Sequence, residues 1–125
     1  MGAWTPEELN AIGGAEELRI AARRPDGTLR NAVTTWLVRV GDEVYARAYK
    51  GTESPWYRGV RRTHEGHVEA GGVAKDVSFA DEPDPAALDA VDAAYRAKYA
   101  RYDAQYVDPM VADTARDATI RLVPR

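Results

Sequence analysis

Two runs of β-branched residues that meet at a tight turn constrain this fold more than any other feature of the chain. Residues 33–40 (VTTWLVRV) end at Gly41-Asp42, and residues 44–49 (VYARAY) follow at once. Two strand-like runs separated by a Gly-Asp pair are typical of a β-hairpin. The middle of the chain is therefore expected to be an antiparallel sheet.

Four further strand-like runs cover residues 17–23, 66–70, 73–79 and 118–123. Their connections are mostly hairpins, and no strand–helix–strand alternation runs through the chain, so a small antiparallel barrel is favoured over a parallel sheet. No linker is long enough to divide the sequence. We expect an α+β fold of about six strands in one domain, residues 1–125.

Cap signals predict three helices beside the barrel. Thr5 and Glu8 form a capping box around Pro6, and Gly13-Gly14 end this first helix. Ser54 is the expected cap of a second short helix that starts at Pro55. These signals place a short helix on either side of the first three predicted strands.

The third helix is predicted to be long and to lie near the C-terminus. Asp84 caps it, and Val107-Asp108-Pro109 are expected to end it. Apolar and aromatic residues recur along it at helical spacing, so it is expected to cover one barrel opening or mediate a dimer. Its tyrosines favour a core or dimer face over a pocket wall with phenol hydroxyls; they are Tyr95, Tyr99, Tyr102 and Tyr106.

Composition excludes several classes of function. There is no cysteine, so disulfides, thiolate metal sites and cysteine nucleophiles are excluded. No apolar run approaches the roughly 20 residues of a membrane span, and the N-terminus lacks a secretory signal, so a cytoplasmic protein is expected. The net charge of -3 disfavours bulk attraction to nucleic acid.

Residues 45–62 nevertheless form a basic segment, with five cations and one acid, Glu53. Backbone N–H groups at a helix start favour anions, and arginine bonds phosphate strongly. The segment predicts a site for a phosphate-bearing small molecule, with Trp36 as a further candidate to pack on a flat ring. The alternative is that its aromatics are core and its cations a solvated face. The predicted site comprises Arg47, Lys50, Thr52, Ser54, Trp56 and Tyr57.

Residues 30–72, from RNAVTTWLVRV to HVEAGG, resemble the split β-barrel flavin-binding proteins, in particular the deazaflavin-dependent nitroreductase group. Over its whole length, including AYRAKY at 94–99 and ATIRLVP at 118–124, the chain is similar to an uncharacterised bacterial family, domain of unknown function 2255. The resemblance implies a split barrel that binds FMN or a deazaflavin. In the nitroreductase group a Gly-Arg-Lys-Ser-Gly turn meets the cofactor; here residues 23–30 carry cations and a hydroxyl in another order.

The functional hypothesis is a homodimeric flavin- or deazaflavin-binding protein that acts as an oxidoreductase. Such a cofactor performs the difficult chemistry, so the lack of an obvious nucleophile or general base does not exclude it. One alternative is a non-enzymatic barrel that has lost the cofactor and serves small-ligand binding or assembly. A weaker alternative is single-stranded nucleic-acid binding through Arg58, Arg61 and Arg62. His64 and His67 favour a surface turn over a metal pair.

Overall fold

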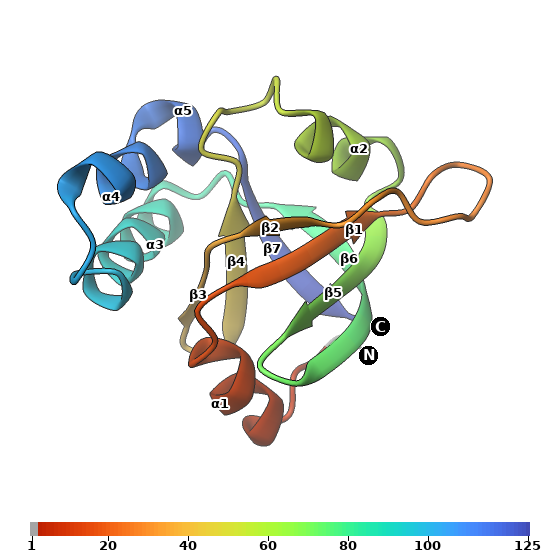
Figure 1. The fold of residues 1–125 in the computed structure, drawn as a ribbon, viewed down its shortest axis with the longest axis horizontal. Helices are drawn as coiled ribbons and strands as arrows, with labels where there is room; N and C mark the ends of the chain where they lie inside the picture. The colour runs from red at the N-terminus through yellow and green to blue at the C-terminus, as the bar shows by residue number, and fades with distance from the viewer. Residues whose placement is uncertain (1–2) are drawn as a thin grey trace.

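The seven strands of the chain form one antiparallel sheet that curls into a nearly closed barrel, in a computed structural model that describes residues 3–125 (Figure 1). The strand order is β2-β1-β5-β6-β7-β4-β3, and the edge strands β2 and β3 follow one another in the sequence. The expected split antiparallel barrel with flanking helices is confirmed, with one strand more than predicted. The strands are β1 (Leu18–Ala22), β2 (Val33–Thr35), β3 (Leu37–Val40), β4 (Glu43–Arg47), β5 (Glu65–Ala70), β6 (Val73–Asp81) and β7 (Thr119–Pro124).

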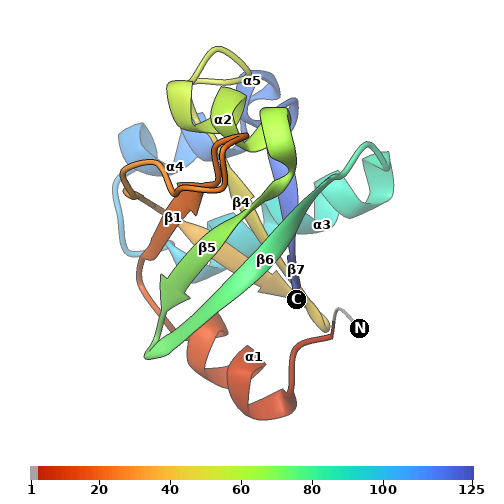
Figure 2. The same cartoon turned by 90° about the vertical axis from the view of Figure 1, so that its right-hand side faces the viewer.

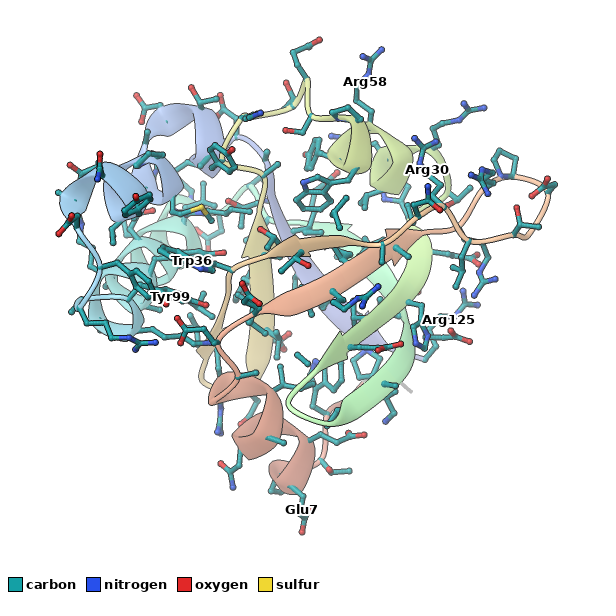
Figure 3. The ribbon with its side chains drawn as sticks, viewed as in Figure 1. Glu7, Arg30, Trp36, Arg58, Tyr99 and Arg125 are labelled. Carbon is teal, nitrogen blue, oxygen red and sulfur yellow. The ribbon has the colours of Figure 1, made fainter. Side chains whose placement is uncertain are left out.

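The additional strand arises because residues 33–40, predicted as one strand, are divided at Trp36. β2 pairs with β1, whereas β3 pairs with β4, so the chain changes partners at this residue. The indole of Trp36 stacks on the ring of Tyr99, with centroids 3.9 Å apart. The backbone N–H of Leu37 donates to the Tyr99 hydroxyl (3.2 Å), which lies 3.0 Å from the Leu37 carbonyl oxygen. Helix side chains therefore bridge the seam where the barrel is split (Figure 3).

The first two helices lie at opposite ends of the barrel (Figure 2). Helix α1 (Pro6–Gly13) has the predicted capping box, and the indole N–H of Trp4 donates to the Leu122 carbonyl (3.0 Å). Helix α2 (Pro55–Thr63) begins where predicted, but the Ser54 side chain makes no capping hydrogen bond. Ser54 is buried instead, and its backbone N–H donates to the Gly51 carbonyl.

The predicted single long helix is wrong, because the segment forms two helices that lie side by side (Figure 1). Tyr99 leaves helical geometry (φ -107°), and Asp103 in extended conformation starts the next helix. Pro109 lies inside that helix and does not end it. The chain reverses direction between the two helices, and this reversal is stabilised because the second helix buries further apolar side chains against the barrel. The helices are α3 (Pro85–Lys98), α4 (Ala104–Val111) and α5 (Asp113–Arg116).

Two separate cores result from this arrangement. The first fills the barrel and includes Leu18, Val44 and Ile120, all fully buried. The second lies between the outer wall of the barrel and α3 and α4, where Tyr95 and Tyr99 are fully buried. The predicted core role of the tyrosines thus applies to Tyr95 and Tyr99.

Candidate functional site

A loop of residues 48–54 connects β4 to α2 and forms the corner where the predicted site lies. Gly51 adopts a positive φ of 88°, and its N–H donates to the Ala48 carbonyl (2.8 Å). A Cβ atom on Gly51 would lie 2.5 Å from the Thr114 methyl carbon. Any larger residue here would push the loop away from α5, so the backbone of the corner is held in place.

Arg47 does not reach this corner, because its side chain enters the interior and is fully buried. Its Nε donates to the Thr119 hydroxyl (2.8 Å), and Nη1 pairs with the Asp92 carboxylate. Nη1 and Nη2 also donate to the carbonyls of Met110 (2.9 Å) and Leu88 (3.1 Å). All three nitrogens are partnered, so Arg47 has a structural role in joining β4 to β7 and the C-terminal helices.

The other predicted residues do lie together at the corner, in different environments. Lys50 and Thr52 are exposed, and the Lys50 amine lies 5.7 Å from the ring centre of Tyr49. Trp56 is half-buried and packs against the barrel core, and Tyr57 is buried. The exposed cation and hydroxyl are therefore available to a ligand, whereas the two aromatic rings mainly support the corner.

Beside the corner lies a basic groove that we call the arginine groove. It has a volume of about 560 Å³, and Arg30 and Arg58 lie beside α2 in Figure 3. A second hollow of about 410 Å³ adjoins it along the hairpin of residues 23–30, and the two share Arg30, Gly59 and Arg62. The arginine groove is lined by Arg30, Thr52, Pro55, Tyr57, Arg58, Gly59, Arg61 and Arg62.

Most cations of the arginine groove have no acidic partner. Within residues 3–125, only Arg61 among them has a carboxylate within 4.0 Å, that of Asp81 at 3.8 Å. Gly59 lets Arg30 cross the helix, since a Cβ at Gly59 would lie 3.0 Å from the Arg30 Cδ. Unneutralised guanidinium groups that face one hollow attract an anion. The corner motif does not predict Arg30, because the contact with α2 joins residues far apart in the sequence.

On the other side of the corner lies a second, less polar groove, which we call the aromatic groove. Its volume is about 320 Å³. Tyr49 and Tyr106 line it with 52% and 57% of their surface exposed, and the partly buried Trp36 lines it from the barrel seam. Because Tyr49 immediately precedes Lys50, the aromatic groove adjoins the corner. The lining residues are Glu17, Thr34, Thr35, Trp36, Tyr49, Gln105, Tyr106, Pro109 and Met110.

The two histidines have separate partners. His64 ends α2 with a positive φ of 57°, and its Nδ1 lies 3.2 Å from the Phe79 carbonyl oxygen. His67 lies on β5, with Nδ1 3.0 Å from the Asp76 carboxylate. A hydrogen bond from His67 is also the main reason that the pKa of Asp76 is lowered. Each ring thus supports a different local contact.

The chain belongs to the family described as "Uncharacterized protein conserved in bacteria (DUF2255)", which matches residues 8–122. Among curated proteins, none matches. No helix within residues 3–125 is both long enough and apolar enough to cross a bilayer.

Several solved structures share the fold at low sequence identity. The haem storage protein HutZ from Vibrio cholerae is 12% identical, with a TM-score of 0.69 over 96% of this chain and 89% of that one. An FAD-binding protein from Mesorhizobium loti is 17% identical, with a TM-score of 0.63 over 98% and 91%. An FMN-binding protein from Nostoc punctiforme related to pyridoxamine 5′-phosphate oxidase is 11% identical, with a TM-score of 0.52 over 100% and 81%. These likenesses establish the barrel fold.

Proposed function

We propose that this protein binds FMN or a deazaflavin cofactor and acts as an oxidoreductase. The observation that carries the proposal is the position of two unlike grooves on the two sides of one corner. The aromatic groove suits a flat ring, and the arginine groove suits an anionic tail. Proteins of the same fold from Mesorhizobium loti and Nostoc punctiforme bind FAD and FMN, which supports this class of ligand.

The residues present fit such a cofactor. Lys50 and Thr52 stand between the grooves with their polar groups exposed, and the start of α2 adds backbone N–H donors. Arg30, Arg58 and Arg62 supply charge without acidic partners among residues 3–125, and the missing Cβ of Gly59 makes room for Arg30. Ser54, Trp56 and Tyr57 would shape the corner from behind.

When bound, the cofactor would supply the redox chemistry, and the protein would orient it. Trp36, which lines the aromatic groove, stacks on Tyr99, and this contact would hold its ring in place beside the cofactor. Tyr49 and Tyr106, both exposed, would cover the ring and exclude water. The protein contributes position and electrostatics under this proposal.

A spectroscopic titration tests the proposal. Purified protein is examined for visible absorption and titrated with FMN, a deazaflavin and riboflavin, which lacks the phosphate. We expect saturable quenching by FMN or the deazaflavin and weaker binding of riboflavin. Lys50→Ala should weaken FMN binding by less than tenfold, since an exposed cation is screened. The absence of a chromophore and of saturable binding would instead support the non-enzymatic barrel.

We also propose that the protein is cytoplasmic and that it forms a homodimer. The exposed rings of Tyr49 and Tyr106 support the dimer, because a second copy would cover them. Sedimentation of the wild type and of Tyr106→Glu checks this inference. The arginine groove also gives the nucleic-acid alternative a specific test. Oligonucleotide affinity that falls steeply with salt, in the absence of flavin binding, would favour that alternative.

A further inference from the structure

A third groove lies beside α1. Figure 2 shows that α1 is at the end of the barrel opposite α2. The volume of the groove is about 510 Å³, and α1, β3 and α3 form its walls. We call it the lysine groove, because Lys98 and Arg39 are the two cations that line it. The remaining lining residues are Leu9, Asn10, Gly13, Gly14, Val38, Ala94 and Ala97, which are mostly small or apolar.

The amine of Lys98 is held in this groove without an acidic partner. Its Nζ donates to the Leu37 carbonyl (2.9 Å) and lies 5.3 Å from the ring centre of Tyr99. No carboxylate of residues 3–125 lies within 4.0 Å of it. The side chain is half-buried, and this burial lowers the pKa of Lys98 to about 8, with Glu16 acting in the opposite direction. Around pH 8 a substantial fraction of this amine is therefore neutral, with a free electron pair.

Arg39 supplies a fixed positive charge to the same groove. Its Nε donates to the Gly41 carbonyl (2.7 Å), and its Nη1 donates to the Asn10 side-chain oxygen (3.0 Å). Its stem lies against Gly13, where a Cβ would approach Arg39 Cδ to 3.1 Å. Both partners are neutral oxygens, so the charge is oriented but not cancelled. A guanidinium forms strong charge-assisted hydrogen bonds with a carboxylate, so Arg39 offers a site for one.

We propose that the lysine groove binds small oxo acids, with the carboxylate on Arg39 and the carbonyl carbon bonded to Lys98. The neutral amine attacks the carbonyl carbon, and the resulting carbinolamine loses one water molecule to give an imine. The proton lost from nitrogen leaves with the carbinolamine hydroxyl as that water. No oxidant or reductant is consumed, and the step is reversible by hydrolysis. The proposal is independent of the flavin site.

The chain offers a sharp internal control, because it contains only three lysines. Lys50 is exposed, and Lys75 is paired with Glu8 at 2.7 Å. The native protein is treated with glyoxylate and cyanoborohydride, which reduces imines to stable adducts, and each lysine is followed by peptide mapping. At about pH 8 we expect Lys98 to be labelled at least roughly tenfold faster than Lys50, because burial lowers the pKa of Lys98 to about 8 and Arg39 offers a site for the carboxylate beside it. Equal labelling of Lys98 and Lys50, or slower labelling of Lys98, would overturn the proposal.

Variants separate the roles of the two cations. Lys98→Arg keeps a charge and a donor for the Leu37 carbonyl, and it should abolish the adduct at this position. Arg39→Gln should slow glyoxylate at Lys98 about tenfold, while acetaldehyde, which has no carboxylate, should react as in the wild type. Lys50→Arg is the matched control and should leave labelling of Lys98 unchanged. If Arg39→Gln slowed both reagents equally, Arg39 would not be the carboxylate site.

Discussion

The cluster around Arg47 and the arginine groove use the same side chain in opposite ways. In the interior, one guanidinium is fully buried and satisfied by a hydroxyl, a carboxylate and two carbonyls. In the arginine groove, Arg30, Arg58 and Arg62 face a hollow without a carboxylate from residues 3–125. A buried charge must be paired within the protein, whereas a surface charge is hydrated and can remain unpaired until a ligand binds. The presence or absence of hydrogen-bond and ion-pair partners within the protein thus distinguishes a structural arginine from a candidate binding arginine.

Removing the interior arginine should have the largest effect. Arg47→Ala removes the donor to Thr119 and to two carbonyls and leaves Asp92 with Arg116 as its remaining cationic partner, so we expect a loss near the lower end of the about 3–5 kcal/mol that breaking a buried ion pair costs. Chemical denaturation should show this loss in the free energy of unfolding. The matched surface change, Arg58→Ala, should stay within about 0.5 kcal/mol. A mild effect of Arg47→Ala would mean that the cluster does not hold the helices to the barrel.

The contrast also shows what the sequence could and could not predict. Capping signals and Gly-containing turns are local, so α1, the start of α2 and both hairpin positions could be predicted from it. The direction of Arg47 depends on Asp92 and Thr119, which are 45 and 72 residues away. Nothing in the segment of residues 45–62 indicates these partners.

The division of the strand at the seam and the two C-terminal helices could not be predicted from local sequence for the same reason. Trp36 divides a β-branched run because Tyr99 stacks on its ring from another element. Pro109 continues α4 because burying Val107 and Met110 outweighs the loss of one helical hydrogen bond. Tertiary packing overrides propensity at each of these positions. The arginine groove forms in the same manner, from a hairpin and a helix.

The second prediction concerns ligand binding instead of stability. Arg30→Gln and Arg62→Gln each remove a charge-assisted donor from the arginine groove, and such a bond contributes about 1.5–3 kcal/mol. FMN affinity should fall by roughly tenfold or more for the partly buried Arg30 and by less for Arg62, which is exposed and screened by solvent, while riboflavin affinity and the denaturation midpoint stay unchanged. Unchanged FMN binding in both variants would move the phosphate away from this groove.

A smaller effect is expected from Gly59→Ala. Alanine stabilises a helix interior by about 1 kcal/mol over glycine, but here its methyl group displaces Arg30, which lies 3.0 Å from that position. We expect little net change in the free energy of unfolding and several-fold weaker FMN binding. Combined with Arg30→Gln, the substitution should add almost nothing, because both act through one side chain. Additive losses in the double variant would show that Gly59 acts independently.

Lys98 is partly buried, so its burial is intermediate between that of Arg47 and that of the exposed arginines of the arginine groove. Its effect on the free energy of unfolding should be the smallest of those predicted. Burial lowers its pKa to about 8 from the ordinary 10.5, so between these values the unfolded chain binds more protons than the folded protein. The contribution of Lys98 to the free energy of unfolding therefore rises as the pH increases between these two values. Below about pH 8 the amine is mostly charged in both states, so the full cost of burying the charge applies. The side chain is only partly buried, so solvent screening keeps the slope shallow.

Denaturation of wild type and Lys98→Met at about pH 7 and about pH 9.5 measures this slope, since ionising tyrosines affect both proteins alike. The wild type should gain stability relative to Lys98→Met as pH rises, because only the wild type sheds the buried charge. Lys50→Met is the control for removing one lysine outside the groove, since Lys50 is exposed. A constant difference for Lys98→Met would show that the amine stays charged in its groove, as a fully hydrated lysine does.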